Sequence, residues 1–268
     1  MLKTVSSLAA IIFLFFLYIR FFEKRTIFYP SKIIEFNPSS VGLEYEDVFF
    51  KTQDGIELHG WFIPKADSYA TVLYCHGNAG NVSHRVEIAK MFNEKKMNFF
   101  IFDYRGFGKS KGSPNEVGTY LDGLAAYNYL VETRAILPER IVLYGKSLGA
   151  AIAIDLATKL KAAALISESG FTSTTDFAQE VYKILPLWLF VSQKYDSLVK
   201  IDKINIPKLI IHSQNDEIVP FSHAKKLYDK AKEPKELYVM KGGHNDAFYI
   251  YNDECMQRID NFLRRYIR

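Results

Sequence analysis

The sequence predicts an α/β fold, a mostly parallel central sheet with helices on both faces. Three observations lead to this prediction. From residue 70 onward, short apolar runs of strand length alternate with longer stretches of helical character, and such alternation requires crossover connections between parallel strands. Before this series, two β-like runs are joined by Asp54-Gly55, a pair that favours a hairpin turn. No internal repeat or low-complexity tract interrupts the alternation. We therefore expect a mixed sheet with a leading antiparallel hairpin.

The expected elements follow the chain in order. Residues 26–43 hold two prolines and several turn formers, which indicates a loop-like linker, and the folded domain is expected over residues 44–268. The hairpin strands are Asp47–Thr52 and Ile56–Ile63. Short apolar runs are typical of strands buried on both faces, and the longer stretches between them favour helices. The later strands are expected at 70–75, 98–102, 140–144, 162–166, 208–212 and 236–240, and the helices at 83–96, 115–134, 148–160, 222–232 and 247–266.

Residues 170–200 interrupt the alternation, and we predict that they form a small lid insertion. The insertion contains an apolar run, Ile184–Val191, which includes Trp188 and Phe190. This run could line a pocket for an acyl chain, or it could contact a bilayer. It could equally be a helix that packs on the core, and the sequence leaves these interpretations open.

The N-terminal residues differ from the rest of the chain. No charged residue occurs from Thr4 to Ile19. Extending this stretch to Phe22 gives a helix of roughly 28 Å at about 1.5 Å per residue, close to the roughly 30 Å of a hydrocarbon core. We therefore predict that residues 1–25 form a membrane anchor with a transmembrane helix. A cleavable signal peptide is the main alternative, but charged residues follow the stretch where a small-x-small site would be needed. A buried globular helix is a third interpretation.

The charges that flank the predicted span indicate its orientation. Only Lys3 and the terminal amine precede the span. The basic residues that follow it are Arg20, Lys24, Arg25 and Lys32. Because basic residues are enriched on the cytoplasmic side of a membrane helix, we expect the main domain to be cytoplasmic.

Composition excludes several classes of function. The net charge is +4, from 34 basic and 30 acidic residues, and no basic stripe with interleaved aromatic residues suggests nucleic acid. Cys75 and Cys255 are too few for a disulfide framework, and neither has the spacing of a redox or metal site. No set of histidine, cysteine and carboxylate residues has metal-ligand spacing. We therefore expect neither a metal ion nor any other cofactor.

Gly-Lys-Ser occurs twice, at Gly108–Ser110 and Gly145–Ser147, and raises the possibility of a phosphate-binding loop. Such a loop needs a further glycine five positions before its Gly-Lys-Ser. Asp103 and Arg140 stand at those positions, so neither copy fits. The second copy also spells Gly-x-Ser-x-Gly, from Gly145 to Gly149.

The Gly-x-Ser-x-Gly motif predicts a nucleophile elbow. Ser147 stands between an apolar strand and a helix, which is the strand-turn-helix context that exposes a nucleophilic serine. Gly145 and Gly149 would provide room where the chain passes close to its neighbours. The motif occurs often by chance, and its place in the strand series is what supports this interpretation.

A nucleophilic serine needs a base, and the base needs an acid to orient it. In folds with a nucleophile elbow the acid and then the histidine follow later strands. Asp216 and His244 each lie four residues beyond the end of a predicted late strand. Glu217 and Asp246 are the competing carboxylates. We predict Asp216 as the acid and His244 as the base.

The oxyanion of an acyl-transfer reaction needs hydrogen-bond donors. The backbone N–H of Leu148, directly after the nucleophile, is the first candidate. The second is the N–H of Asn78, in a glycine-rich turn after the strand at 70–75, with Ala79 as the next choice. Alternatively this turn is an ordinary loop in which Asn81 or Ser83 caps the following helix.

These motifs resemble those of the membrane-anchored α/β-hydrolases of the bud-emergence type. Related groups are the α/β-hydrolase-domain depalmitoylases and the serine aminopeptidase-like lipases. The resemblance runs from Phe28 to the C-terminus and depends on five segments: His76–Asn81, Asp103–Ser110, Gly145–Gly149, His212–Pro220 and Gly243–Asn245. It implies the α/β-hydrolase fold, with the family's catalytic serine, acid and base at Ser147, Asp216 and His244. Asp103–Gly106 is interpreted as a structural loop. Unlike the animal depalmitoylases, this chain has no cysteine before Cys75.

The sequence therefore predicts a membrane-anchored serine hydrolase that cleaves carboxylic esters or thioesters through a Ser-His-Asp triad and an acyl-enzyme. The expected substrate is a small-molecule or lipid acyl compound, or an acylated protein, and the expected surroundings include a membrane. A serine peptidase or amidase is one alternative. A catalytically silent, membrane-tethered scaffold is another. The oligomeric state is left open.

Overall fold

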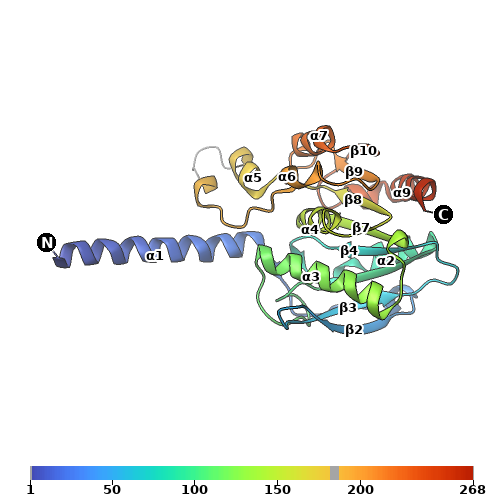
Figure 1. The fold of residues 1–268 in the computed structure, drawn as a ribbon, viewed down its shortest axis with the longest axis horizontal. Coiled ribbons are helices and arrows are strands. Elements are labelled where there is room, and N and C mark those ends of the chain that lie inside the picture. Colours follow the sequence, from blue (N-terminus) through green and yellow to red (C-terminus); the bar gives the residue numbers. More distant parts are fainter. Residues whose placement is uncertain (1, 182–186, 268) are drawn as a thin grey trace.

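The computed structural model describes residues 2–181 and 187–267, without the side chains of residues 2–12, 15, 16 and 187. Its centre is one eight-stranded sheet with helices on both faces (Figure 1). From edge to edge the strands are β10 (Lys235–Met240), β9 (Lys208–Ser213), β8 (Ala164–Glu168), β7 (Ile141–Lys146), β4 (Ala70–Cys75), β6 (Met97–Phe102), β3 (Glu57–Ile63) and β2 (Glu46–Lys51).

The predicted mixed sheet is confirmed. The strand pairs from β10 to β6 are all parallel, whereas β3 pairs antiparallel with both β6 and β2. The turn of the β2–β3 hairpin contains Gly55 at φ +80°, a conformation that glycine adopts without steric cost. Because the strands from β10 to β6 all run in the same direction, their carboxyl ends meet at one edge of the domain.

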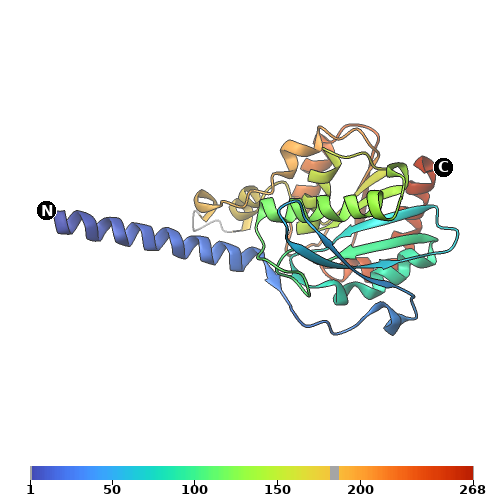
Figure 2. The same cartoon turned by 60° about the horizontal axis from the view of Figure 1, so that its bottom comes forward.

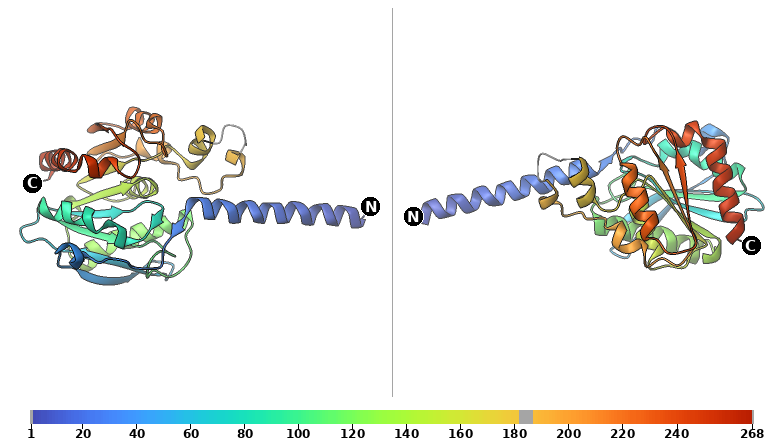
Figure 3. Two further views of the ribbon diagram at one scale, coloured as in Figure 1. Left: turned by 180° about the vertical axis from the view of Figure 1, so that it is seen from behind. Right: turned by 90° about the horizontal axis from the view of Figure 1, so that it is seen from above.

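Two apolar layers enclose the sheet, because successive residues of a strand point to opposite faces. Leu73 of β4 belongs to the layer that also contains residues of α3 (Glu116–Asn128), α4 (Leu148–Ala157), α6 (Ser197–Ile201) and α7 (Phe221–Lys230). Its neighbour Val72 belongs to the layer that contains residues of α2 (Val86–Glu94), α8 (Ala247–Ile250) and α9 (Asn252–Tyr266). Figure 3 shows the two layers from behind and from above. Cys75 and Cys255 are buried and unbridged.

Several element ends differ from the sequence prediction. The helix predicted at 115–134 begins at its cap Asn115 but passes into a π-helical turn, η3 (Tyr129–Thr133). The last predicted helix is broken at Tyr251 into α8 and α9. The strand predicted at 162–166 runs instead from Ala164 to Glu168. A charged residue such as Glu168 suggests a loop, but here it is the last residue of β8 and is buried.

The predicted linker, residues 26–43, contains regular structure. A short strand β1 (Tyr29–Pro30) pairs in parallel with β5 (Ala79–Gly80), and a 3-10 turn η1 (Pro38–Val41) follows. A two-residue strand is too short to leave a periodic pattern, and its partner lies far along the chain. The linker is therefore tied to the loop that carries Asn78, whose carbonyl accepts the N–H of Tyr29 at 2.9 Å.

Residues 2–27 form one long helix, α1 (Leu2–Ile27), which projects away from the domain (Figures 1 and 2). Within the part of the chain that the structure describes, no helix combines the length and apolar character needed to cross a membrane. The predicted transmembrane helix is therefore not confirmed. Most of the stretch that motivated it, Thr4–Ile19, consists of side chains outside the described set.

The insertion between β8 and β9 contains α5 (Thr174–Val181), a 3-10 turn η5 (Leu187–Phe190) and α6. Of these elements, α5 and η5 lie beside the domain end of α1 (Figures 1 and 3). The first part of the predicted apolar run Ile184–Val191 falls outside the described residues. We call residues 170–200 of this insertion the lid. Its described residues Phe190 and Val191 line the cavity that holds the candidate active site.

Candidate active site

Ser147 occupies a strained turn between β7 and α4. Its backbone has φ +54° and ψ −116°, a region that residues with a Cβ rarely adopt. Its N–H donates to the carbonyl of Glu168 on the neighbouring strand at 2.8 Å, which fixes the turn against the sheet. The residues on either side, Lys146 and Leu148, are buried, whereas Ser147 is partly exposed. The turn thus presents a serine to the cavity.

The two glycines of the motif are required by space. A Cβ added to Gly149 would lie 1.9 Å from the carbonyl oxygen of Cys75, and one added to Gly145 would lie 2.1 Å from the carbonyl oxygen of Gly149. Both obstructions are backbone atoms, which cannot move aside as a side chain can. The close approach lets α4 start directly against β4 and β7.

Asp216 and His244, from loops after β9 and β10, form a hydrogen-bonded pair. His244 Nδ1 lies 2.7 Å from Asp216 Oδ2. The other carboxylate oxygen of Asp216 accepts the backbone N–H groups of Ile218 and Val219 at 3.0 and 2.7 Å. Burial by itself raises the pKa of Asp216, but these bonds and the neighbouring histidines bring it below its ordinary value. Asp216 is therefore ionised at neutral pH and can orient the imidazole.

The competing carboxylates hold the backbone of the histidine loop. Glu217 accepts the N–H of His244 at 3.0 Å, and Asp246 accepts the N–H of Gly243 at 2.6 Å. Neither bond involves the imidazole ring, so both residues shape the loop that presents His244.

His212 is a neighbour that the sequence did not indicate. Its Nε2 lies 3.4 Å from Asp216 Oδ2 and 2.8 Å from the carbonyl oxygen of Val219. Burial lowers the pKa of His212, so the ring is neutral and donates hydrogen bonds without adding a charge. His212 is the second-to-last residue of β9, and only the fold of the Asp216 loop brings it close to that carboxylate.

The two candidate oxyanion donors line the same cavity as Ser147 and His244. In the described ranges 2–181 and 187–267, no protein acceptor is bonded to the backbone N–H of Leu148 or of Asn78. The bond between the Asn78 carbonyl and Tyr29 fixes the plane of the following peptide. The alternative role of this turn is also present, because Asn81 caps η2 (Val82–Arg85).

Lys146 occupies the first x of the Gly-x-Ser-x-Gly motif, and its side chain is buried in an ion pair. Its Nζ lies 2.8 Å from Glu168 Oε1, and the hydroxyl of Tyr144 donates to Glu168 Oε2 at 2.6 Å. Lys146 also lines the cavity. The pair links β7 to β8 directly beneath Ser147.

The segment Asp103–Ser110 has a structural role. Arg105 forms buried contacts to Asp122 at 2.9 Å and reaches Asp54 in the hairpin turn at 2.8 Å. Burial raises the pKa of Asp122 to about 6 despite its contact with Arg105. The segment therefore ties β6 to α3 and to the hairpin.

The cavity around Ser147 has a volume of about 550 Å³. One wall comes from the lid, with Phe171 and Phe177 as its largest side chains besides Phe190. A second wall comes from the domain end of α1, which includes Ile19 and Phe22. No local pattern indicated this second wall, because a linker separates α1 from the domain and the contact is set by the fold.

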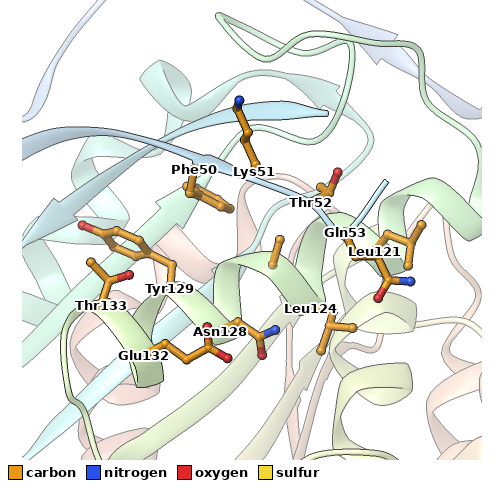
Figure 4. A pocket seen from close by; sticks show the side chains of 11 residues that line it. Phe50, Lys51, Thr52, Gln53, Leu121, Leu124, Asn128, Tyr129, Glu132 and Thr133 are labelled. Carbon is orange, nitrogen blue, oxygen red and sulfur yellow. The ribbon is translucent and has the colours of Figure 1, made fainter. Parts of the chain in front are cut away.

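A second cavity, of about 310 Å³, lies between the end of β2 and the helices α3 and η3 (Figure 4). Phe50 and Tyr129 lie at one end of it, with Asn128 and Glu132 along its helical side. Its lining includes none of the predicted site residues. The cavity at the carboxyl ends of the parallel strands is the one that combines a strained serine with an acid–histidine pair.

Comparison with known proteins agrees with this fold. Residues 66–197 match the family described as serine aminopeptidase, S33. The chain is 34% identical over 248 residues to protein bem46 of Schizosaccharomyces pombe, covering 87% of this chain and 81% of that protein. It is 31% identical over 272 residues to the alpha/beta hydrolase domain-containing protein WAV2 of Arabidopsis thaliana, covering 91% and 88%. The solved esterase Pf2001 of Pyrococcus furiosus shares the fold, with a TM-score of 0.75 at 23% identity, covering 90% of this chain and 98% of that one.

Proposed function

We propose, from the premise that this chain belongs to the bem46-like family of α/β hydrolases, that it is a serine hydrolase for carboxylic esters or thioesters. The observation that carries the proposal is the meeting of three features in one cavity. They are the strained Ser147 elbow, the 2.7 Å contact between His244 and Asp216, and the backbone N–H groups of Leu148 and Asn78.

The reaction would proceed through an acyl-enzyme. Because Nδ1 of His244 is bonded to Asp216, Nε2 is the nitrogen that takes the proton of Ser147 as its Oγ attacks the acyl carbonyl. The N–H groups of Leu148 and Asn78 stabilise the oxyanion. The C–O or C–S bond then breaks, and His244 gives its proton to the leaving alcohol or thiol. Water, deprotonated by His244, then attacks the acyl carbonyl; the bond to Ser147 Oγ breaks, the acid is released, and His244 returns the proton to Oγ.

Apolar side chains support an acyl group as the part of the substrate that is bound. Phe171, Phe177 and Phe190 line the cavity beside Ser147, and binding sites for small molecules use mainly such side chains with a few placed polar groups. We propose small-molecule or lipid acyl esters and thioesters, or an acylated protein, as substrates.

A peptidase or amidase is the second candidate, favoured by the match to the serine aminopeptidase family. An aminopeptidase needs a carboxylate to receive the substrate's amino group. Glu23 is an acidic residue of the cavity wall, but its carboxylate already accepts the N–H groups of Ser192 and Gln193 at 2.5 and 2.9 Å. This arrangement favours ester and thioester cleavage over aminopeptidase activity.

Labelling with a fluorophosphonate probe tests the proposal. The full chain, purified in mild detergent, should label, and Ser147→Ala should not. Ser110→Ala is the matched control, because this serine follows the same Gly-Lys dipeptide but its side chain is buried. Turnover of p-nitrophenyl esters, acyl thioesters and aminoacyl anilides then separates the candidates. A folded wild-type chain that neither labels nor turns over any of them would support the catalytically silent scaffold instead.

Residues 1–25 are proposed to anchor the domain to a membrane, with the domain on the cytoplasmic side. The proposal is supported by the uncharged stretch Thr4–Ile19 and by the basic residues after it. Extraction of cell membranes with alkaline carbonate should leave the full chain in the pellet and release a chain lacking residues 2–16. Release of the full chain would contradict the anchor.

A further inference from the structure

We propose that the last turns of α1 are part of the substrate-binding site and select the acyl chain, so that this helix is more than a tether. The inference rests on the proposed function, because it assigns a binding wall to the same cavity. Five residues of α1 line the cavity that holds Ser147 and His244: Ile19, Phe22, Glu23, Thr26 and Ile27.

These five residues form one face of the helix. Their spacing of three and four residues is that of neighbours on a helical surface. Phe21 lies on a different face and does not line the cavity. It is 59% exposed, against 49% for Phe22, and the guanidinium of Arg25 lies 5.2 Å from its ring centroid. The cavity-lining face extends from residue 27 to residue 19, a length of about 12 Å at 1.5 Å per residue. A chain-like apolar ligand could follow this face away from Ser147.

Specific contacts hold this part of α1 on the lid. Besides the two N–H groups of Ser192 and Gln193, Glu23 accepts the hydroxyl of Ser192, 169 residues away in the sequence. Arg20 donates to the carbonyl of Phe190 at 3.0 Å and contacts Glu23 at 3.2 Å. Hydrogen bonds that involve a charged partner are roughly twice as strong as neutral ones. These bonds fix the position of the helix relative to the lid.

The other side of the same lid segment is held by α3. Glu116 accepts the N–H groups of Lys194 and Tyr195 at 2.6 and 2.7 Å. Carboxylates from two different helices therefore hold consecutive residues of the segment 192–195. Phe190 and Val191, which line the cavity, directly precede this segment. The position of the apolar lid wall consequently depends on Glu23 of α1.

The base of α1 is also fixed to the domain. Lys24 Nζ donates to the hydroxyl of Ser113 at 2.5 Å, and Phe28 is only 4% exposed. The ring of Phe28 packs on Tyr195, with centroids 6.5 Å apart. Because the helix is held at the lid and at the core, its apolar face presents a fixed surface to the cavity.

A pair of neighbouring substitutions tests the inference. Phe22→Ala removes a wall side chain, and Phe21→Ala removes the same ring from the face that does not line the cavity. The measurement is kcat/KM of the full chain in detergent for p-nitrophenyl acetate, octanoate and dodecanoate. We expect Phe22→Ala to lower the octanoate-to-acetate and dodecanoate-to-acetate ratios by at least about fivefold, because several methylene contacts are lost. Phe21→Ala should leave both ratios unchanged.

The outcomes separate this inference from the proposed function. Equal chain-length profiles in wild type, Phe22→Ala and Phe21→Ala, with Ser147 still labelled by the fluorophosphonate, would overturn the inference alone. A wild-type chain without labelling or turnover would overturn both. A changed profile only in Phe22→Ala supports the assignment of α1 to the binding site.

Glu23 is a positioning residue, and a second pair of variants tests that role. Glu23→Ala should raise KM for the octanoate ester severalfold with little change in kcat, because the lid wall moves while the reacting groups stay in place. Glu23→Gln keeps an amide oxygen that can accept the lid N–H groups, so its KM should lie between wild type and Glu23→Ala. Equal KM values in all three chains would contradict the positioning role.

Discussion

The two Gly-Lys-Ser segments of this chain lie at or after the carboxyl end of a strand that pairs in parallel with β4, yet their serines have opposite environments: Gly108–Ser110 follows β6, and Gly145–Ser147 begins within the last residues of β7. Ser110 is 1% exposed; its hydroxyl donates to the carbonyl of Asp103 at 2.7 Å and accepts the N–H of His59 at 2.9 Å. Ser147 faces the cavity from a strained backbone. The first serine closes a loop, and the second is available for chemistry.

The lysines and glycines of the two segments also have different surroundings. Lys109 pairs with Asp47 at 2.9 Å where both side chains are well exposed, whereas Lys146 pairs with Glu168 where both are buried. Gly108 has φ +43°, and a Cβ added to it would meet the side-chain carboxylate of Asp103, whereas a Cβ added to Gly145 would meet the backbone carbonyl of Gly149. Identical letters thus acquire different roles from the elements that flank them: a loop follows β6, and a helix follows β7 at once.

The largest difference between the segments should appear in turnover. Ser147→Ala should lower kcat for p-nitrophenyl esters by about 10⁴-fold or more, the size of effect seen when a serine hydrolase loses its nucleophile. Ser110→Ala should stay within a few-fold of wild type. Steady-state kinetics on both folded variants make the measurement. A comparable loss of kcat in both would break the comparison.

The lysines should differ in stability. Lys146→Met leaves the buried carboxylate of Glu168 without its cation, which should cost about 3–5 kcal/mol in the free energy of unfolding. Lys109→Met removes an exposed pair and should cost about 0–1 kcal/mol. Urea unfolding followed by circular dichroism, with the full chain in detergent, gives both values. The distinction fails if the two variants unfold at the same urea concentration.

Ser110→Ala should affect folding although it spares turnover. It leaves the carbonyl of Asp103 and the N–H of His59 buried without this partner, which should cost about 1–3 kcal/mol in the free energy of unfolding. Ser39→Ala, at an exposed position of η1, is the control and should be near neutral. An Ser110→Ala chain as stable as the control would show that the loop does not depend on this hydroxyl.

A further expected effect concerns stability in acid. His76 Nε2 lies 3.7 Å from Asp103, and burial lowers the pKa of His76 to about 3. A histidine with a lowered folded-state pKa takes up its proton first in the unfolded state, so stability is lost as pH falls from about 6.5 towards about 3, by up to about 1.4 kcal/mol per pH unit.

The variant His76→Asn isolates this effect. Burial raises the pKa of Asp103, which acts in the opposite sense at low pH, and this carboxyl is present in both chains. The free energy of unfolding, measured in urea at pH 7.5, 6 and 5, should fall less steeply in His76→Asn than in wild type. Parallel slopes would exclude His76 as a source of the acid dependence.

Much of the fold was predictable because burial and turns leave local patterns. The strand at Ala70–Cys75 was placed to the residue, and the Asp-Gly pair identified the hairpin. The order of the motifs also predicted that Ser147, Asp216 and His244 lie at one edge of the sheet, because the carboxyl ends of parallel strands meet there. The catalytic roles of these residues stay a prediction that labelling must test.

The sequence by itself determined the class of fold, the mixed sheet and the positions from which a serine, a carboxylate and a histidine could meet, because alternation of apolar runs and turn-forming residues is written locally in the chain. Only the tertiary structure decided the buried pairing of Lys146 with Glu168 and the wall that α1 adds to the cavity. Both features depend on which strand or helix lies next to the residues concerned. Register and packing between distant segments decide this, and they leave no periodic pattern in either segment alone.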